Sequence, residues 1–512
     1  MRTSVLWAML LFAGVSQCAR ILGINPTRSI SHQTPFLAIM AALAEKGHQV
    51  TVVTTHPLKV PPKGLTQIDV APLIPMGETK EQFEDIAEVT NKELQESILP
   101  WSEHICDTTL VYPEIQQLLR SKDKFDLVVL ETLFFWCYFG FIHELGSPPV
   151  VGFLSVGMTP TLNSLIGNPY NPSYIPDSHS VLTSHMSFWD RMRNSYDVLN
   201  LLSHFYNHVL PAHSRLIEKH YGKHVPDLEE MISNISLVIA ANHFSIDYPQ
   251  PLLPNVVQVT GMHIVQERKP LPKEIQDFLD GAEHGFIYFS LGSNMKSSFL
   301  PENTLAALLQ AFAELPQRVL WKFEATELPG RPDNVMIAGW LPQQDVLAHK
   351  NIRLFITQGG LQSFNEAAYF GVPLIGIPFF FDQKYEVAKM VSAGIGKKLV
   401  LRSLTKETAL DALNGVLRNS SYREKMEQFS AVYREHQETS LQRAVWWVEY
   451  VLRHDGAPHL RSAATHLRWW QLLLLDAIAV LLAAALVVIF VVYKLVRCLR
   501  SALRRNNKQK QS

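Results

Sequence analysis

The feature that most constrains this chain is an apolar run near its C-terminal end, LLLLDAIAVLLAAALVVIFVVY at residues 472–493. A helix rising about 1.5 Å per residue covers about 33 Å over this length, enough to cross a bilayer core of about 30 Å. Trp469 and Trp470 precede the run, where an interfacial aromatic belt is expected. Asp476 lies within the first turns and can stay near the lipid headgroups. The sequence therefore predicts a folded body that one transmembrane helix anchors to a membrane.

A basic segment follows the predicted span. Residues 494–512 carry seven Lys and Arg side chains and no Asp or Glu. The positive-inside rule places this short tail in the cytosol and the body across the membrane, a single-pass type I topology. Lysines at the third and fifth positions from the end, in KQKQS, resemble the dilysine retrieval signal of endoplasmic-reticulum membrane proteins. We therefore expect an endoplasmic-reticulum protein with a lumenal body, although an ordinary basic anchor is the alternative for these lysines.

The first residues have the layout of a secretory signal peptide. Arg2 is followed by an apolar run at residues 5–15 and then by small residues. This order predicts a signal peptide over residues 1–18, with cleavage between Ser16 and Ala19. The alternative is a buried first helix.

A lumenal body gives meaning to two further patterns. Asn234 and Asn419 begin Asn-x-Ser sequons and are predicted glycosylation sites, whereas Asn25 is followed by a proline that blocks modification. Cys106 and Cys137 can form one disulfide in that compartment, or can equally be buried and free.

Composition excludes several other classes of protein. The formal charge of −1 is a sum of +7 in the tail and −8 over residues 1–493, so no basic excess points to nucleic-acid binding. The apolar content of 47% excludes a disordered chain, and four cysteines in 512 residues exclude a disulfide scaffold. The length predicts two domains, and it leaves a homo-oligomer open.

Between the two ends, short apolar strands alternate with helices, which predicts an α/β fold with parallel sheets. Residues 157–221 have no clean period and are interpreted as an irregular substrate-side insertion. In the first half, the predicted strands are residues 20–25, 49–55, 125–131, 148–155 and 236–242.

Residues 248–274 carry five prolines and are predicted to be a linker. The alternation then restarts, with strands expected at residues 285–293, 318–323, 334–340 and 353–358. We therefore predict two Rossmann-like domains, residues 19–247 and 275–455, with a ligand in the cleft between them and a terminal helix that can cross back. Neither domain carries G-x-G-x-x-G, so an NAD-type site has no support.

Small, polar and charged residues concentrate in residues 339–383. A predicted strand ends at Gln358-Gly359-Gly360, and a helix begins near residues 361–363. Glycines allow close approach of a ligand to the backbone, and the first N–H groups of a helix form an anion site. Ser363 and Glu366 lie on the first two turns of that helix, and Asp382-Gln383 follows the next predicted strand. A diphosphate with attached hydroxyl-rich groups would suit these side chains.

This stretch resembles the signature of the family-1 UDP-glycosyltransferases, which include the membrane-bound UDP-glucuronosyltransferases of animals. The resemblance covers essentially the whole chain and implies the GT-B fold of two Rossmann-like domains plus the transmembrane helix. The segments FITQGGLQS and KPLPKEIQDFLD are most similar to the insect members.

The resemblance implies a role for each residue of a UDP-sugar site. Trp340 should stack on the uracil ring, Gln343 should hold the nucleoside, and Glu366 should bind the ribose hydroxyls. The diphosphate should contact Gln358, Gly360, Gln362 and Ser363. Asp382 and Gln383 should hold the transferred sugar, and Ser293 in the SLGS turn should face the donor. Without the motif, core packing is the better interpretation of Trp340.

The family's catalytic base is a histidine after the first strand, which corresponds to His32 in SISHQTPF. Imidazole titrates near neutral pH and can remove the proton of an attacking hydroxyl. The family's orienting acid corresponds to Glu131. The alternatives are a surface-loop histidine and a strand-end charge.

Four residues depart from the family pattern. Gln358 replaces a common His, Glu131 replaces Asp, Phe381 replaces a Gly, and Phe364 is bulkier than usual. These departures bear on the donor sugar and on the partner of the base.

The sequence thus predicts an inverting transferase that moves a hexose from a UDP-sugar to a hydroxyl of a small lipophilic acceptor, as in detoxification. Glucose is the favoured sugar and glucuronic acid the second. No cofactor or metal is expected, since no Asp-x-Asp occurs and the cysteines are scattered. One alternative is a catalytically impaired, membrane-anchored UDP-sugar-binding protein; a serine hydrolase is disfavoured because G-x-S-x-G is absent.

Overall fold

The computed structural model describes residues 18–74, 91–121, 124–265, 268–435 and 439–509. It divides into two compact units, residues 1–461 and residues 462–512. The predicted signal peptide lies outside the described residues apart from Cys18, and so do the last three residues of the predicted tail.

The first unit contains a seven-stranded parallel sheet in the order β3-β2-β1-β4-β5-β6-β7. Its strands are short aliphatic runs because helices cover both faces, so no polar face is needed. In β1, Leu22 and Ile24 join one hydrophobic core and Ile21 joins the other, as the alternation of a strand requires. The strands are β1 (Arg20–Asn25), β2 (Gln49–Thr54), β3 (Leu65–Asp69), β4 (Leu127–Glu131), β5 (Val150–Leu154), β6 (Leu237–Ala240) and β7 (Val256–Gln258).

The strand order reverses beside β1. From β1 the chain adds β2 and β3 on one side, and it then returns to place β4 on the other side. Ile24 pairs with Leu130 in register, so the last residues of the two strands, Asn25 and Glu131, lie side by side. A crevice forms outside the carboxyl ends of the strands at such a switch point, and ligands of open α/β sheets bind there.

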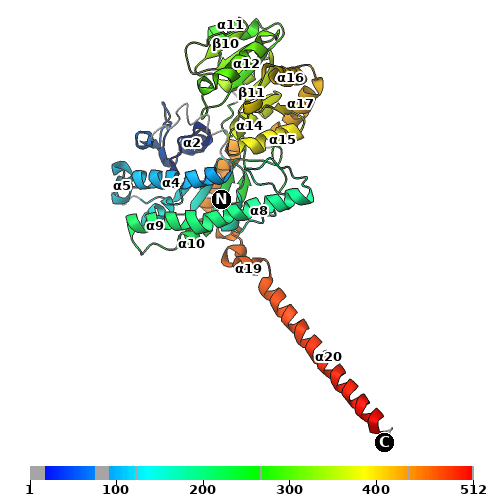
Figure 1. Ribbon diagram of the computed structural model, residues 1–512. Helices are drawn as coiled ribbons and strands as arrows, with labels where there is room; N and C mark the ends of the chain where they lie inside the picture. The colour runs from blue at the N-terminus through cyan, green and yellow to red at the C-terminus, as the bar shows by residue number, and fades with distance from the viewer. Residues whose placement is uncertain (1–17, 75–90, 122–123, 266–267, 436–438, 510–512) are drawn as a thin grey trace, which may run out of the picture. The chain divides into compact units, whose positions relative to one another are not determined.

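Eight α-helices, one π-helical segment and one short 3-10 helix, η1 (Ala71–Leu73), lie among the described residues between β1 and β7, and several are visible in Figure 1. The predicted irregular segment, residues 157–221, contains one short helix, an irregular stretch at residues 166–187, and two α-helices joined by a π-helical segment. The helices are α2 (Ile30–Glu45), α4 (Asn91–Leu110), α5 (Pro113–Arg120), α6 (Tyr138–Glu144), α7 (Pro160–Leu165), α8 (Phe188–His204), η2 (Phe205–Val209), α9 (Leu210–Tyr221) and α10 (Leu228–Ser233).

The same unit contains a second, six-stranded parallel sheet in the order β10-β9-β8-β11-β12-β13. Its order reverses between β8 and β11, which creates a second switch point. The strands are β8 (Phe286–Ser290), β9 (Arg318–Lys322), β10 (Val335–Ala338), β11 (Ile352–Thr357), β12 (Leu374–Gly376) and β13 (Gly396–Lys398). The helices are α11 (Lys273–Asp280), α12 (Glu302–Ala313), α13 (Gln343–Leu347), α14 (Leu361–Phe370), α15 (Gln383–Ser392), α16 (Lys406–Leu417) and α17 (Ser420–Arg434) (Figure 1).

Two segments sit differently from the predicted domain boundaries. Residues 256–258 fall in the predicted linker, but they form β7 at the edge of the first sheet because Val256 and Val257 are buried there. Helix α18 (Ser440–Arg453) follows the second sheet in sequence, yet it packs on α2. Its buried residues Ala444 and Val448 share a core cluster with strands of the first sheet.

Cys106 and Cys137 form a disulfide, which decides between the two alternatives that the sequence left open. The bond joins α4 to the N-cap residue of α6, and both cysteines are fully buried. It therefore fixes the far end of the loop that begins at Glu131.

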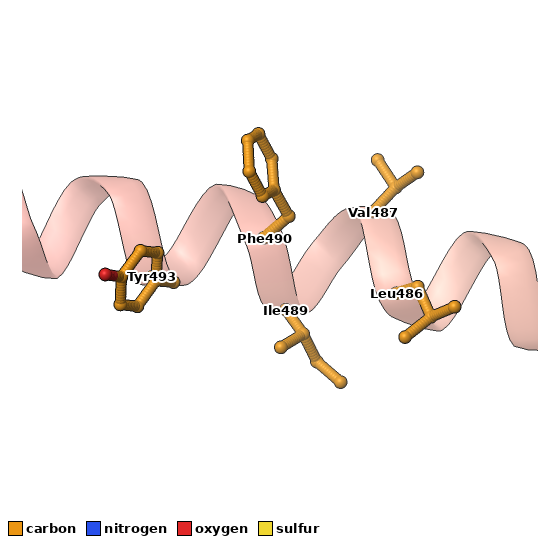
Figure 2. A pocket seen from close by; sticks show the side chains of 5 residues that line it. All are labelled: Leu486, Val487, Ile489, Phe490 and Tyr493. Atoms are coloured by element: carbon orange, nitrogen blue, oxygen red, sulfur yellow. The ribbon is translucent and has the colours of Figure 1, made fainter.

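The second unit contains α19 (Trp469–Leu472) and α20 (Leu475–Gln509). Residues 475–503 of α20 are long and apolar enough to cross a membrane, and protein buries none of this segment. Five of its side chains project away from the helix (Figure 2): Leu486, Val487, Ile489, Phe490 and Tyr493. The span was predicted to end at residue 493, but the helix continues into the basic segment. Lys and Arg have good helix propensity, so nothing in residues 494–509 stops it.

Removing the disulfide should destabilise the first unit by about 2–4 kcal/mol, because the unfolded chain gains the entropy of an open loop. We expect the double substitution C106A/C137A to lower the midpoint of thermal unfolding in detergent. Cys498→Ser, which removes an exposed free cysteine, is the control and should leave the midpoint unchanged. A non-reducing peptide map that shows no 106–137 pair would contradict the expectation.

Candidate active site

The first sheet supplies three side chains at its switch point. His32 lies in the first turn of α2, directly after β1 and the turn that follows it. Glu131 ends β4, and Ser155 follows the next strand, β5. Because β1, β4 and β5 are adjacent and parallel, their carboxyl ends bring the three side chains together.

These side chains form a hydrogen-bonded chain. His32 Nδ1 lies 2.6 Å from Ser155 Oγ and 3.3 Å from Glu131 Oε1. Ser155 Oγ donates to Glu131 Oε1 over 3.5 Å, and the backbone N–H of Leu133 donates to Glu131 Oε2 over 3.2 Å. A carboxylate only accepts hydrogen bonds, so the contact with Glu131 places the imidazole proton on Nδ1. Nε2 is then the nitrogen that can take up a proton.

The burial of this chain is uneven. Glu131 is fully buried, whereas the His32 side chain is 17% exposed. The sequence predicted the proximity of His32 and Glu131 but missed Ser155. One signal for Ser155 was available in the sequence: it ends the predicted strand that follows the one ending at Glu131.

Aromatic rings line one side of His32. The Phe134 ring stacks at 6.4 Å from the imidazole, and Trp101 of α4 lies 5.6 Å from Phe134 and 5.4 Å from Phe135. These rings provide an apolar wall beside the histidine. The disulfide between α4 and α6 ties together the two segments that carry it.

The second sheet supplies a turn of close backbone approach after β11. Gly359 has a φ of +84°, and a Cβ there would lie 2.4 Å from Val387 of α15. Gly292, in the turn after β8, has a φ of +77°, and a Cβ there would lie 2.5 Å from Nε2 of Gln358. Both positions therefore require glycine, and they let α15 and Gln358 approach the ends of the two central strands.

The predicted diphosphate residues gather around the start of α14. Gly360 is the N-cap residue of this helix, Ser363 lies in its first turn, and Gln362 is partly exposed. The buried oxygen Oε1 of Gln358 has no hydrogen-bond partner among the described residues. Ser293 is partly exposed in the turn after β8. Because β8 and β11 are neighbours, this turn lies at the same switch point as the residues at the start of α14.

The predicted nucleoside residues form a second cluster. Gln343 Nε2 donates to Glu366 Oε2 over 2.6 Å and to Ser363 Oγ over 3.1 Å. The other oxygen of Glu366 accepts from Gln344 over 3.2 Å and contacts His263 Nε2 at 3.1 Å. His263 comes from the predicted linker, and the sequence gave no periodic signal for it.

Trp340 ends the stretch after β10 and is 65% exposed, which excludes the alternative of core packing. The ammonium of Lys322 lies 5.9 Å from its ring centre. An exposed indole at the edge of the sheet can stack on a planar ring.

The predicted sugar residues lie at the start of α15. Gln383 accepts from the backbone N–H groups of Phe379 and Phe380 over 2.8 and 3.3 Å, so its amide nitrogen is the end available to donate. Phe381 has a φ of +51°, in the left-handed region that favours glycine. The departure from glycine at this position therefore carries backbone strain.

Asp382, in the second domain, interacts electrostatically with two histidines of the first domain. Burial raises the pKa of its carboxyl above the ordinary value, and electrostatic interaction with His32 and with His179 opposes that rise. His32 and His179 belong to the first sheet's domain, whereas Asp382 belongs to the second.

Hydrogen bonds and an ionic cluster hold the two domains at this point. Asn294, after β8, donates to the hydroxyl of Ser29 over 3.1 Å. Tyr385 donates to Asp247 over 2.6 Å, and Lys389 lies 3.5 Å from the same carboxylate. Lys389 also pairs with Glu386 at 3.0 Å. Helix α15 is thereby fixed to the segment that follows β6.

The two predicted glycosylation sites are both exposed. Asn234 caps the end of α10, where its oxygen accepts from Arg461 over 3.2 Å. Asn419 caps the start of α17 with its oxygen, which leaves its amide nitrogen pointing away from that bond.

Two solved structures that align with this chain are glycosyltransferases. VinC in complex with DTDP aligns with a TM-score of 0.55 at 18% identity, over 85% of this chain and all of that one. CalG4, the calicheamicin glycosyltransferase, aligns with a TM-score of 0.54 at 20% identity, over 85% of this chain and 99% of that one. The two parallel sheets with facing switch points are therefore the GT-B glycosyltransferase fold.

The sequence comparisons identify the family. The profile described as "UDP-glucoronosyl and UDP-glucosyl transferase" matches residues 20–510. UDP-glucosyltransferase 2 of Dactylopius coccus is 38% identical over 96% of this chain and 95% of its own length. UDP-glucuronosyltransferase 2B18 of Macaca fascicularis is 31% identical over 91% and 90%. The chain belongs to the family-1 UDP-glycosyltransferases, and it is an enzyme that transfers sugar from a UDP-sugar.

The ionic cluster generates a prediction about pH. Burial raises the pKa of Glu386 to about 8, against an ordinary value of 4.5. The folded protein thus favours the neutral carboxyl, and its stability falls as pH rises between these two values. Glu386→Gln should lessen this fall by an amount on the order of a few kcal/mol, measured as Tm against pH. The exposed Glu327→Gln is the control and should keep the wild-type slope; an unchanged slope in Glu386→Gln would contradict the expectation.

Proposed function

We propose that this enzyme moves a hexose, with glucose favoured over glucuronic acid, to a hydroxyl of a small lipophilic acceptor with inversion at the anomeric carbon. The observation that carries the proposal is the His32–Ser155–Glu131 chain, which lies within the electrostatic reach of Asp382. The proton acceptor and a carboxylate suited to binding sugar hydroxyls thus interact electrostatically.

His32 acts as the general base in this proposal. Its Nδ1 proton is held toward Ser155 and Glu131, so Nε2 receives the acceptor's proton as the oxygen attacks the sugar. The buried carboxylate of Glu131 stabilises the imidazolium that forms.

The donor is held by the second sheet. The uracil stacks on the exposed face of Trp340, and Gln343 and Glu366 bind the nucleoside. The ribose hydroxyls displace the hydrogen bonds that Glu366 now accepts from Gln343 and Gln344. Asp382 and the amide of Gln383 bind the sugar hydroxyls.

The departing diphosphate gains its stabilisation from the start of α14. The backbone N–H groups of residues 360–363 point at the charge that develops on the diphosphate. Gln358 donates a neutral hydrogen bond to it, at the position where many family members have His. These groups supply what a cation would otherwise supply, so we expect no cofactor or metal requirement.

The identity of the sugar is supported from two sides. The relative at 38% identity is named a UDP-glucosyltransferase, whereas the one at 31% is named a UDP-glucuronosyltransferase. Asp382 would also repel a second carboxylate on the sugar. The acceptor is proposed to lie against Trp101 and Phe134, whose partly exposed rings suit a lipophilic phenol or alcohol.

The setting that we propose is the lumenal side of the endoplasmic-reticulum membrane. Helix α20 provides the anchor, the basic tail lies in the cytosol, and the exposed Asn234 and Asn419 carry glycans. Conjugation of lipophilic compounds for detoxification is the role that fits such a site.

The base is tested by His32→Ala in microsomes. We expect transfer from UDP-glucose to a phenol to fall by about 10²- to 10⁴-fold, because the hydroxyl loses its proton acceptor. His284→Ala is the control, since His284 is exposed at the amino end of β8, at the opposite edge of the sheet. Wild-type enzyme should use UDP-glucose faster than UDP-glucuronic acid.

Two results would contradict this proposal. Unchanged transfer by His32→Ala would exclude His32 as the base. Binding of UDP by the wild-type enzyme in calorimetry, without transfer from any UDP-hexose, would favour the impaired binding protein instead.

Ser155 is proposed as a positioning residue that acts through His32. Ser155→Ala should lower kcat by about tenfold and leave the donor KM unchanged, because the hydroxyl contacts the imidazole of His32 and the carboxylate of Glu131, and neither is a proposed donor-binding residue. The pH profile of kcat should also move, which a merely structural defect would not cause. A change in donor KM with an unmoved pH profile would overturn the role.

A further inference from the structure

The chain crosses from the first domain to the second at residues 262–264. Strand β7 pairs with β6 of the first sheet, and Met262 still lies in a hydrophobic core of that sheet. Ile264 packs against a core cluster of the second domain. His263 stands between them, and the exposed fraction of its side chain is 4%. Because its two neighbours are fixed in different cores, the imidazole has little freedom to move.

The imidazole of His263 contacts the proposed ribose residue. Its Nε2 lies 3.1 Å from Oε1 of Glu366, a side chain of α14 that is 8% exposed. A carboxylate only accepts hydrogen bonds, so the contact places the imidazole proton on Nε2. The other ring nitrogen, Nδ1, is buried and has no hydrogen-bond partner among the described residues. Within the described part of the chain, Glu366 is therefore the polar contact of this side chain.

The unpaired Nδ1 argues against a role of His263 in packing alone. A buried polar atom without a partner destabilises the folded protein, and buried polar groups are normally paired. A residue that only filled this space would be apolar, since leucine would leave no unpaired nitrogen. Histidine carries that cost and supplies one donor, which points at Glu366. The donor, and not the volume of the ring, is what this position requires.

The backbone on either side of His263 is bonded to the same place. Gln344 Nε2 donates to the carbonyl of His263 over 3.0 Å and to Glu366 Oε1 over 3.2 Å. Gln344 Oε1 accepts from the N–H of Val265 over 3.0 Å. The linker is thus hydrogen-bonded to α13 and to α14 at the point where α14 carries Glu366.

His263 is the most firmly held of the groups that donate to Glu366. The other donors are two glutamines of α13, Gln343 and Gln344, and both are partly exposed. They can turn away when the ribose hydroxyls arrive, whereas the buried imidazole cannot. A carboxylate offers about four lone-pair sites, so Glu366 can keep its bond to His263 and still accept from two hydroxyls.

We propose that His263 is a positioning residue for the donor, whose Nε2–H fixes the Glu366 carboxylate so that its remaining lone pairs face the ribose hydroxyls. The inference rests on the proposed nucleoside role of Glu366, and it deepens that role by assigning the group that orients the carboxylate. Because His263 lies where the chain crosses between the domains, the alignment of the ribose site also depends on the linker.

Two substitutions separate the donated bond from the volume of the ring. In His263→Gln the amide nitrogen reaches the position of Nε2, whereas in His263→Asn it reaches only the position of Nδ1, which bonds to no described residue. The full-length variants are purified in detergent, and their Tm is compared with that of the wild type. Isothermal titration calorimetry then measures the binding of UDP and of 2′,3′-dideoxyuridine diphosphate, which lacks the ribose hydroxyls.

We expect the wild type to bind UDP at least about tenfold more tightly than the dideoxy compound, because the hydroxyls donate to a charged group. His263→Asn should weaken UDP binding about tenfold and leave the dideoxy compound unchanged, so that this preference disappears. His263→Gln should remain within about threefold of the wild type for both ligands. In steady-state transfer, His263→Asn should raise the donor KM and leave kcat unchanged, since the ribose is remote from the reacting atoms.

Three results with the His263 variants would overturn the inference: wild-type binding of UDP by His263→Asn, equal weakening of both ligands by it, or no rescue by His263→Gln. Glu366→Ala distinguishes such a failure from that of the proposed function. If Glu366→Ala still prefers UDP over the dideoxy compound, the nucleoside role of Glu366 is wrong and the inference falls with it. If Glu366→Ala loses the preference and His263→Asn keeps it, only the inference is wrong.

Discussion

Parallel pairing of neighbouring strands is the constraint on which the rest of this structure depends. Because β1 and β4 run side by side in register, the turn after β1 and the last residue of β4 meet at one edge. His32 and Glu131 have no other reason to approach, since 98 residues lie between them. The same pairing of β8 with β11 brings the Ser293 turn to the start of α14. Each half of the site is thus a consequence of strand order.

The contacts between the domains decide how the two edges face each other. Helix α15 approaches the central strands only because Gly359 and Gly376 leave room for Val387. Its far side is held by Asp247, which accepts from Tyr385 and pairs with Lys389. Because α15 is held on both sides, Asp382 at its start stays close enough to His32 for the two side chains to interact electrostatically. This ionic cluster therefore holds the start of α15, which carries the proposed sugar-binding residues, and the same packing tolerates the strain at Phe381.

Most of the fold was predictable from local patterns. Aliphatic runs that alternate with helices predicted both sheets, and the signature after β11 predicted the donor residues that the structure brings together. The failures have physical causes. β7 was hidden among prolines because a three-residue edge strand has no period. The sequence allowed the terminal helix to cross back, as α18 does on α2, but a helix pattern does not name its partner. The sequence could not decide whether Trp340 packs in the core or is exposed for stacking, since the fold determines which side chains are exposed.

The sequence by itself determined the apolar C-terminal helix and the two halves of alternating strands and helices, because both follow from composition and spacing along the chain. The roles of the site residues were implied by the resemblance to a family. Tertiary structure alone decided that Cys106 pairs with Cys137, that Ser155 stands between His32 and Glu131, and that His263 reaches Glu366. These are contacts between distant segments, and only the packing of the sheets and helices sets such distances.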